Sequence, residues 1–485
     1  MTIGPKNGFG IVSAIFDLIV SAVVAATKLR CKMDIRIHEK GPNKMNNKLA
    51  MGWVIPMTAV LLASCGGNGG GSGKEGSGAP EGAVKPADQP VTLVVNNGVN
   101  SDDQERFMQD YGNAIRKKFP HVTLEYHPSA ALKDRVTAQE TIDIVYTSIG
   151  LTPSQLMEFG LQYDISELIK KYQYDLNRLE PSTVKMQQQL ADGGIYGLPV
   201  HTTTLALYYN KDIFDKFGAP YPKDGMTWDE LYELTKKVSR TEGGVMYRGF
   251  SMSFPHMMRL NQQSLPYLES KTNKVLYGSD NFKQMTENLT RFFRLPGNEG
   301  DADTAVLSKQ VNLFIKDKTL AMLAHLTTSM REPAMREAFK TMNWDVVSLP
   351  YLKESPGLGP QSYPTFFYVS STSKHKDAAF QVIAYLTSDE FQLEQSKKGI
   401  PSILKSPEVM KAYAQDDEYS AGKNRKGMIP GKYADPALYT KYSSAAEAGL
   451  LTALSRISQG QEDTNTALRV STETAEKAIK ELQAK

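Results

Sequence analysis

The residue types that carry out covalent catalysis are sparse in this chain of 485 residues. Its two cysteines are Cys31 and Cys65, so the long stretch after Cys65 contains no thiol. The seven histidines are scattered, and neither the zinc pattern His-Glu-x-x-His nor the nucleophile pattern Gly-x-Ser-x-Gly occurs. The residues therefore favour binding over reaction, and we expect no catalytic residue, no cofactor and no metal ion.

One short stretch, Gly73-Lys74-Glu75, resembles part of a phosphate-binding loop. The full pattern needs glycine at position 68 and serine or threonine at position 75, where the chain has Asn68 and Glu75. The stretch also lies in a Gly/Ser-rich segment with no strand before it. We interpret it as linker, so an ATPase acting with this protein would be a separate chain.

Cys65 closes an apolar run from Leu49 to Ala63, which follows a short positive segment containing Lys48. This is the layout of a secretory signal. The sequence Leu62-Ala63-Ser64-Cys65 resembles the bacterial lipobox, which implies cleavage before Cys65 and attachment of acyl chains such as palmitate to it. Residues 65–90 would then form a flexible Gly/Ser-rich tether. The alternative is an ordinary signal peptide in which the cysteine stands by chance.

A second apolar segment, Ile11 to Ala26, precedes this signal. It is interrupted by Asp17 and is short for a membrane span. We interpret residues 1–64 as an N-terminal extension plus a signal peptide that is removed, with the signal starting at Met45. The rival interpretation is a real membrane segment at residues 11–26. A lipid anchor favours a cell without an outer membrane, as in Gram-positive bacteria.

The composition is that of a soluble globular protein, with 41% hydrophobic and 22% charged residues. Residues 1–64 hold eight basic and three acidic residues, which leaves 48 basic and 50 acidic residues from Cys65 onward. This balance excludes a basic surface for nucleic acid. The length favours two or three domains, and we expect a monomer.

Strand and helix patterns alternate from Val91 onward. The β-branched run Val91–Val95, the alternating stretch His121–His127 and the apolar stretch Thr141–Thr147 each predict a strand. Between the first two strands, apolar residues recur with a helical period until Phe119-Pro120. This order is typical of an α/β domain with a largely parallel sheet.

Three motifs lie between Ile195 and Val238. They are Tyr196-Gly197-Leu198-Pro199, Leu207-Tyr208-Tyr209-Asn210-Lys211-Asp212 and Thr227-Trp228-Asp229-Glu230-Leu231. In the last motif Thr227 is predicted to cap a helix, with Glu230 at the capping-box position. With NWDVVSLP at Asn343–Pro350, these motifs resemble the family 1 extracellular solute-binding proteins, the receptors of ABC importers that include the maltose-binding type. The resemblance runs from Val91 to the C-terminus.

The resemblance implies an α/β fold of two lobes, each a mainly parallel sheet flanked by helices, with the ligand in the cleft between them. Lobe one is expected to comprise residues 91–200 and 321–366, and lobe two residues 205–320 and 370–485. The chain would cross between the lobes near His201–Thr204, Ala321–His325 and Phe366–Ser370. Closure about these crossings would trap the ligand.

The same resemblance nominates residues that contact the ligand, at the carboxyl ends of strands and at the crossings. The candidates are Asn96, Asn97, Tyr146, Thr147, Ser148, His201, Thr202, Tyr209, Ser253, Phe254, His256, His325, Thr328 and Tyr363. They offer amides, hydroxyls and aromatic rings, which suit a sugar. Trp228 and Trp344 are interpreted as structural.

The sequence thus predicts a lipid-anchored receptor outside the cytoplasm, which binds a carbohydrate, preferably an oligosaccharide, and delivers it to an ABC importer permease. It is not expected to be an enzyme. Alternatives with the same fold are a receptor for a peptide or polyamine, and a ligand sensor for a membrane receptor. A secreted polysaccharide-cleaving enzyme would need two carboxylates facing each other across the cleft, and no such pair is evident.

Overall fold

The structure is a computed structural model that describes residues 89–99, 103–301 and 306–484. The predictions for Cys65, for the signal peptide within residues 1–64 and for nearly all of the tether concern residues outside these ranges. Across the described residues, no helix is both long and apolar enough to cross a membrane.

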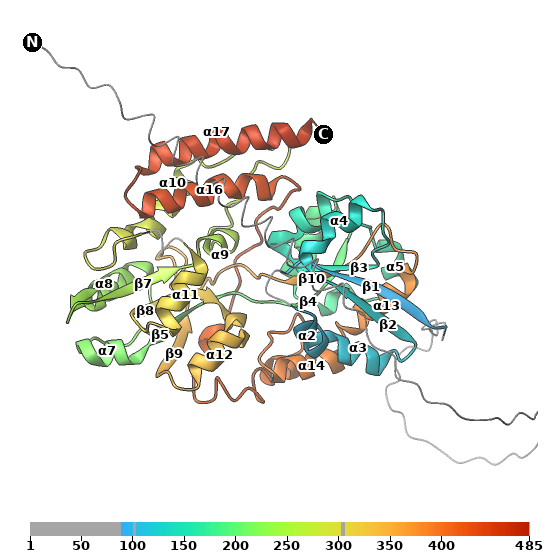
Figure 1. The fold of residues 1–485 in the computed structure, drawn as a ribbon, viewed down its shortest axis with the longest axis horizontal. Coiled ribbons are helices and arrows are strands. Elements are labelled where there is room, and N and C mark those ends of the chain that lie inside the picture. The colour runs from blue at the N-terminus through green and yellow to red at the C-terminus, as the bar shows by residue number, and fades with distance from the viewer. Residues whose placement is uncertain (1–88, 100–102, 302–305, 485) are drawn as a thin grey trace, which may run out of the picture. The chain divides into compact units, whose positions relative to one another are not determined.

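The first of two sheets has five strands in the order β2-β1-β3-β10-β4 (Figure 1). Strand β1 pairs in parallel with β2 and β3, whereas β10 runs antiparallel between β3 and β4. The strands are β1 (Val91–Asn97), β2 (Val122–His127), β3 (Ile144–Ser148), β4 (Gly197–His201) and β10 (Thr365–Val369). The three strands predicted at the start of the body are confirmed, as is the parallel pairing among them.

The second sheet has the order β6-β7-β8-β5-β9. Only β7 and β8 pair in parallel; the other three pairs are antiparallel. The strands are β5 (Leu205–Asn210), β6 (Arg240–Glu242), β7 (Val245–Met252), β8 (Leu320–Leu326) and β9 (Trp344–Ser348). Both sheets are therefore mixed, so the expectation of a mainly parallel sheet in each lobe is wrong. Strands such as β10 and β5 enter their sheets from the other lobe and run antiparallel to their neighbours. Helices flank both sheets, which confirms the α/β class.

Helices follow most strands and begin at recognisable caps. Thr227 Oγ1 accepts from the backbone N–H of Glu230 at 3.2 Å, and Glu230 Oε2 accepts from the N–H of Thr227 at 2.7 Å, which confirms the predicted capping box. The helices are α2 (Gln104–Phe107), α3 (Asn113–Lys118), α4 (Leu132–Thr137), α5 (Ser166–Lys171), α6 (Pro181–Leu190), α7 (Lys211–Phe217), α8 (Trp228–Val238), α9 (Phe254–Arg259), α10 (Asp280–Thr290), α11 (Leu307–Ile315), α12 (Pro333–Phe339), α13 (Lys376–Tyr385), α14 (Asp389–Lys397), α15 (Pro407–Lys411), α16 (Ser443–Ser458) and α17 (Thr464–Gln483).

The strand pairing corrects the expected division into lobes. Strands β8 and β9 pair with β5 in the second sheet, so the assignment of residues 321–366 to lobe one is wrong for both. A strand belongs to the sheet whose backbone groups satisfy its own, and this is not visible in its sequence position.

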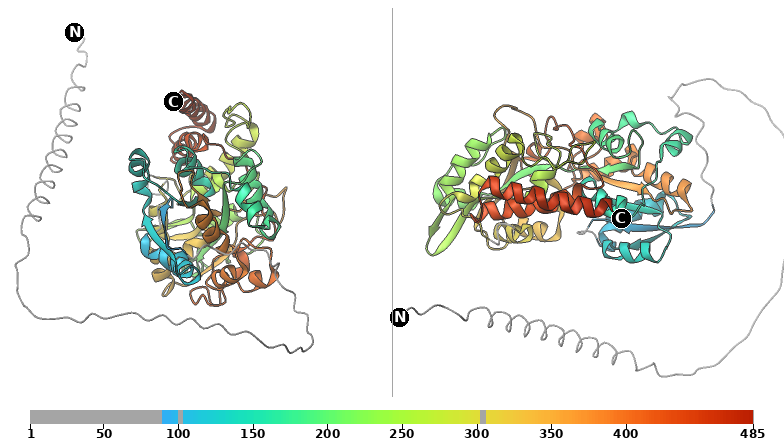
Figure 2. Two further views of the ribbon diagram at one scale, coloured as in Figure 1. Left: turned by 90° about the vertical axis from the view of Figure 1, so that its right-hand side faces the viewer. Right: turned by 90° about the horizontal axis from the view of Figure 1, so that it is seen from above.

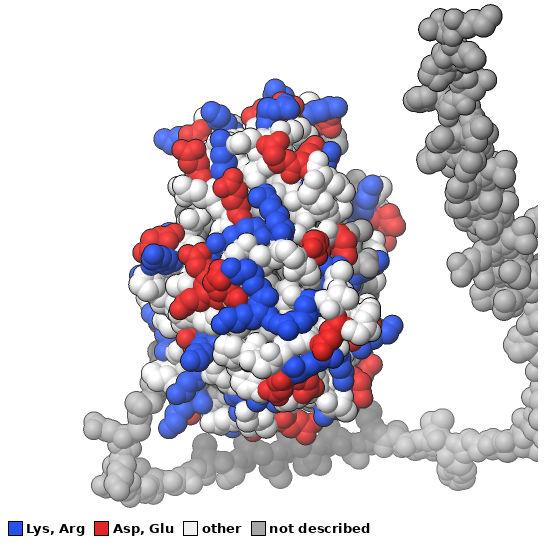
Figure 3. Space-filling model, turned by 90° about the vertical axis from the view of Figure 1, so that its left-hand side faces the viewer, with Lys and Arg blue, Asp and Glu red and all other residues white. Residues whose placement is uncertain are grey.

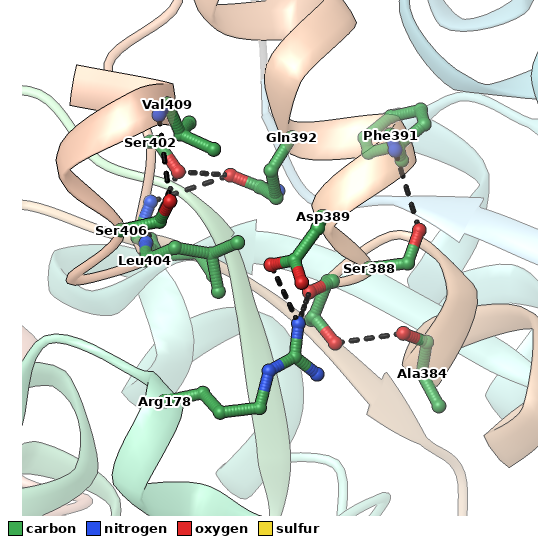
Figure 4. Close-up of polar contacts among 12 residues, drawn as sticks. Arg178, Ala384, Ser388, Asp389, Phe391, Gln392, Ser402, Leu404, Ser406 and Val409 are labelled. Atoms are coloured by element: carbon green, nitrogen blue, oxygen red, sulfur yellow. Dashed lines mark hydrogen bonds and ion pairs between the residues drawn. The ribbon is translucent and has the colours of Figure 1, made fainter. Parts of the chain in front are cut away.

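Helices α13 and α14 require the opposite correction, because they attach to the first sheet. Gln392 on α14 donates from Nε2 to the carbonyl oxygen of Val200 in β4 at 2.6 Å. Its Oε1 accepts from Ser402 Oγ at 2.7 Å, and Arg178 pairs with Asp389 at 3.0 Å (Figure 4). The assignment of all of residues 370–485 to lobe two is therefore wrong for this stretch.

The connections between the sheets differ from the expected crossings in two of three places. Residues 202–204 link β4 to β5, as predicted for His201–Thr204. The stretch Ala321–His325 lies inside β8, and Phe366–Ser370 overlaps β10, so neither is a crossing. The second connection is instead the segment 349–364, which joins β9 to β10.

The two C-terminal helices pack on the second sheet's side of the core. Helices α16 and α17 lie side by side (Figures 1 and 2). Leu450 and Leu454 of α16 and Leu468 of α17 share a buried cluster with Phe292 and Phe293, which follow α10. These helices are therefore part of the hydrophobic core and not an appendage.

Charges of both signs intermingle on the face of the molecule that Figure 3 shows. Several exposed ion pairs join residues close in the sequence, such as Lys236 with Glu233 at 2.6 Å, three residues apart. Such exposed pairs contribute little to stability. The charge pairs that matter for the site are the buried ones described next.

Candidate functional site

The two connections between the sheets run side by side and are joined by hydroxyl groups. Tyr363 donates its backbone N–H to the carbonyl of Thr203 at 2.8 Å and accepts from the Thr203 N–H at 3.2 Å. Thr202 Oγ1 lies 2.7 Å from Ser362 Oγ, and Thr203 Oγ1 lies 2.9 Å from Thr327 Oγ1. A narrow two-stranded bridge of small side chains, as here, suits a hinge.

Tyr363 on this bridge brings the two sheets together through its hydroxyl. That hydroxyl shares a 3.1 Å hydrogen bond with Ser148 Oγ at the end of β3. It also accepts from Arg259 Nη1 on α9 at 3.1 Å. The ring of Tyr363 meets the ring of His256 edge-on at 5.9 Å. Three predicted site residues from distant segments, Ser148, His256 and Tyr363, therefore converge.

Two histidines extend this cluster into the second sheet. The ring centroids of His256 and of His325, near the end of β8, are 5.7 Å apart. Ser253 Oγ lies 2.7 Å from His256 Nδ1, whereas His325 Nδ1 is buried without a partner among the described residues. Burial lowers the pKa of His325 to about 4 and holds that of His256 well below its usual value. At neutral pH both rings are uncharged and can each donate and accept.

A buried ion pair lies beside the histidines. Arg259 donates from Nε to Glu447 Oε1 at 2.7 Å and from Nη2 to Oε2 at 2.5 Å, a bidentate contact. Tyr267 also donates to Glu447 Oε1 at 2.9 Å. Burial would lower the pKa of Arg259, but Tyr363 and Glu447 raise it well above its ordinary value. The sequence analysis did not nominate either charged residue. A signal was present, because Glu447 is the single acidic residue in the stretch SSAAEAGLL, which is otherwise small or apolar.

A second buried pair joins the two sheets near His201. Arg331, just after β8, donates from Nη2 to Asp110 Oδ1 at 2.7 Å. His201 Nδ1 lies 2.9 Å from the hydroxyl of Tyr111, and the two rings stack at 6.3 Å. Burial lowers the pKa of His201 to about 4. Burial would raise the pKa of Asp110, but Arg331 outweighs it and the pKa is lowered. Asp110 and Arg331 were also missed.

The candidates at the ends of β1 and β3 are buried. Their side chains contact neighbouring residues in or beside the same sheet. Asn97 donates from Nδ2 to the hydroxyl of Tyr126 at 2.9 Å, and Thr147 Oγ1 donates to the carbonyl of Gly98 at 3.0 Å. Tyr146 stacks on Phe367 at 4.9 Å. Asn96 donates to the carbonyl of Asn97 at 2.9 Å, and its Oδ1 is buried without a partner among the described residues.

The remaining candidates divide between core and bridge. Tyr209 packs edge-on against Phe214 at 5.7 Å, and Phe254 packs against Phe293 at 5.5 Å, so both rings belong to the core. Thr328 bonds the hydroxyl of Thr203 on the bridge at 3.2 Å.

Most of these side chains are out of reach of a solute in this arrangement. Of the candidates, His201, His256 and Thr328 are half-buried, and the others are buried. A solute could reach the buried ones only if the two sheets moved apart about the bridge. No group of three or more His, Cys, Asp or Glu side chains in the described ranges could hold a metal ion.

A comparison with protein families identifies the family to which the chain belongs. Residues 100–393 of the 485 match the model of the bacterial extracellular solute-binding proteins, which is more than half of the chain. The chain belongs to this family. The resemblance found in the motifs around Tyr208 and Trp228 is thereby confirmed, and the family places this solute-binding protein outside the cytoplasm.

Individual relatives are distant. The solute-binding protein is 22% identical to the arabinooligosaccharide-binding protein of Bacillus subtilis over 43% of this chain and 49% of that protein. It is 24% identical to the galactooligosaccharide-binding protein of the same organism over 61% of this chain and 68% of that protein. The first of these matches spans only about half the length of the relative.

Solved structures confirm the two-lobed fold. An ABC substrate-binding protein from Listeria monocytogenes, solved in complex with cycloalternan, superposes with a TM-score of 0.65. It shares 16% sequence identity with this chain, and the match covers 81% of this chain and 100% of that one. At 16% sequence identity, the similarity shows only that the two proteins share a fold.

Proposed function

We propose that this solute-binding protein captures a carbohydrate, preferably an oligosaccharide, and delivers it to the permease of an ABC importer. One observation carries the proposal: Ser148 from the first sheet, His256 from the second and Tyr363 from the bridge meet in one cluster. Hydroxyls, imidazoles and a phenol are the groups that bind sugar hydroxyls. The names of the oligosaccharide-binding relatives support the same substrate class.

The charges near the cluster support an uncharged solute. Arg259 is paired with Glu447, and Asp110 with Arg331, so these buried charges satisfy one another. A charged solute such as a polyamine would need an opposite charge that is available to it, because an unpaired buried charge is costly. The groups left to bind a solute are neutral donors and acceptors.

Capture would work by lobe movement. We take lobe one as the elements around β1–β4 and β10 with α13 and α14, and lobe two as the elements around β5–β9 with α16 and α17. Solute that binds more tightly when the lobes are together shifts the population to that form. The closed form is then the one that the permease recognises.

We also propose that Cys65 carries a lipid anchor and that residues 65–90 tether the body to the membrane. About 25 flexible residues would reach roughly 25–30 Å, enough for the body to dock on a permease. Replacing Cys65 with alanine should release the protein into the medium of the producing cell. Retention in the membrane fraction would point to the apolar segment at residues 11–26 instead.

The solute class can be tested by thermal unfolding of the full chain with a panel of oligosaccharides, monosaccharides, peptides and polyamines. A solute at 100 times its Kd should stabilise the protein by about 2.7 kcal/mol. We expect an oligosaccharide to give the largest shift. A shift by a peptide or polyamine and by no sugar would replace the substrate class proposed here.

Two further experiments test whether the protein is instead an enzyme or a ligand sensor. Incubation with the bound oligosaccharide should leave it intact, and the appearance of cleavage products would make the protein an enzyme. Pull-down with solute should recover permease subunits. Recovery of a membrane receptor without a permease would make the protein a ligand sensor.

A further inference from the structure

A cavity of about 190 Å³ lies within lobe two, lined by the first turn of α8, by α9 and the residues after it, by α10 and by residues 349–354. None of the predicted ligand contacts lines it. Helix α9 separates it from the cluster around Tyr363. His256 and Arg259 belong to that cluster, whereas Met257 and Leu260 line the cavity.

The side chain of Gln262 links the elements on two sides of the cavity through hydrogen bonds. Its Oε1 accepts from the indole N–H of Trp228 at 3.0 Å. Its Nε2 donates to the carbonyl oxygens of Pro350 and Leu358 at 3.0 and 3.1 Å. Gln262 thus ties α8 to the segment after β9. The cavity is therefore preformed in this structure.

The floor of the cavity is apolar. Trp228 lines it, and because its N–H is already bonded, the indole offers carbon surface. Met285 and Leu289 on α10 add aliphatic surface beside it. An aromatic ring with aliphatic neighbours is the surface that takes the C–H face of a sugar ring.

Carboxamides supply the polar part of the lining. Gln263 lines the cavity, and its Oε1 is buried without a hydrogen-bond partner among the described residues. A carboxamide in the lining can both donate to and accept from a ligand hydroxyl. Asn288 and Gln284 on α10 line the cavity as well. The lining contains three charged residues. Asp229 is paired with Arg291 at 2.7 Å, and Lys353 and Glu354 carry opposite charges, so the lining does not favour a ligand of one charge.

We propose that this cavity is a second binding site, which takes one neutral, hydroxylated ring such as a single hexose or pentose unit. The apolar floor takes the C–H face of the ring, and the carboxamides of Gln263, Gln284 and Asn288 hydrogen-bond its hydroxyls. The site is independent of the cluster around Tyr363 and goes beyond the proposed capture of an oligosaccharide. A free monosaccharide would bind here whether or not the lobes are closed.

Saturation-transfer NMR of the full chain with D-glucose, D-galactose and L-arabinose at millimolar concentration tests the proposal. At least one of these sugars should give a signal with the wild type. Gln263→Leu, which keeps the shape of the side chain and removes its hydrogen-bonding groups, should weaken that binding about ten-fold. Met285→Trp, which fills the cavity, should abolish it. Tyr363→Phe, which alters the other cluster, is the matched control and should leave the signal unchanged.

The same proteins separate this proposal from the proposed function. Thermal shifts with oligosaccharides report on the cluster around Tyr363 and should persist in Gln263→Leu. Loss of the monosaccharide signal in Tyr363→Phe, its survival in Gln263→Leu, or its absence in the wild type would overturn the second site. Absence of every oligosaccharide shift would overturn the proposed function and leave the second site standing. Should Met285→Trp fail to fold, Gln263→Leu alone decides.

Discussion

Arg259 and Glu447 show how much one residue pair can determine at the candidate site. Their side chains are 13% and 8% exposed, so each charge depends on the other. The pair also orients Tyr363, whose hydroxyl accepts from Arg259 and meets Ser148 in the other lobe. A pair of this kind need not add net stability, but breaking it is expensive.

Replacing Glu447 with alanine should lower the free energy of unfolding by about 3–5 kcal/mol, because it leaves the Arg259 cation buried and unpaired. Urea unfolding measures the loss. Glu473→Ala is the matched control, since Glu473 pairs with Arg469 at 2.7 Å on α17 with both side chains more than 60% exposed. The control should cost about 0.5 kcal/mol or less. Equal losses of unfolding free energy in the two variants would show that breaking the buried pair costs no more than breaking an exposed one.

His325 should make the protein sensitive to acid. Its folded-state pKa is about 4, below the ordinary value of 6.5, so the unfolded chain binds more protons between these two pH values. Stability from this group is complete above pH 6.5 and falls as pH drops towards 4. At about 1.4 kcal/mol per pH unit, the full loss is up to about 3.5 kcal/mol.

The variant His325→Gln should therefore show a shallower fall in unfolding free energy between pH 6.5 and 4 than the wild type. His375→Gln, at an exposed position before α13, is the control and should keep the wild-type slope. The slope is the diagnostic quantity, because an overall loss of stability from repacking would shift the curve without changing its slope. An unchanged slope in His325→Gln would contradict the argument.

Among the elements, the turn after β3 lies in close contact with the connecting segment and with α9. A Cβ atom on Gly150 would lie 2.5 Å from the hydroxyl of Tyr363 and 2.8 Å from Cδ of Arg259. Tyr363 and Arg259 are held by their own hydrogen bonds, so neither can yield freely. Glycine at the end of this strand is therefore what allows α9 and the bridge to reach β3.

Gly150→Ala should weaken the contact between Ser148 and Tyr363 and destabilise the protein by about 1–3 kcal/mol through overpacking. Thermal unfolding measures the loss, and small-angle scattering should show a larger radius of gyration if the lobes separate. Gly278→Ala is the control, since a Cβ there meets nothing within 4 Å. A Gly150→Ala protein as stable and compact as this control would mean that the turn is not a close contact in solution.

The two lobes are joined by side-chain contacts as well as by the segments of chain that run between them. Besides the bridge around Thr203, Asp110 beside α3 and Arg331 after β8 form a buried pair across the lobes, with side chains 11% and 13% exposed. This contact and that of Ser148 with Tyr363 must both change if solute is to enter. These polar contacts between the lobes can form and break, which is a property that a capture mechanism needs.

Arg331→Met should shift the lobes towards separation, because it leaves the Asp110 carboxylate without its main partner. We expect a loss of about 2–5 kcal/mol in unfolding free energy or a larger radius of gyration. The variant should also bind the solute more weakly. Lys340→Met, which breaks an exposed pair with Glu337 at the end of α12, should change none of these quantities. Identical solution scattering and affinity in the two variants would argue against an interlobe role for Arg331.

Local sequence was enough to predict the elements and the family. The β-branched run at Val91–Val95 predicts β1, and Thr227 with Glu230 predicts the start of α8, because propensity and capping depend on residues within a few positions. The motifs around Tyr208 and Trp228 then identified the family. Ser148, His256 and Tyr363, which were nominated as ligand contacts, lie together in the structure, and their role as contacts stays a prediction. These inferences needed no knowledge of which segments meet.

The lobe to which β8, β9 and α14 belong, and the charges beside the site, emerged only from the folded chain. Arg259 and Glu447 are 188 positions apart, and Asp110 and Arg331 are 221 apart. Nothing near any of them in sequence marks its partner. Buried charges and strand edges must be satisfied by whichever groups the fold brings to them, so the pairing is a property of the tertiary structure.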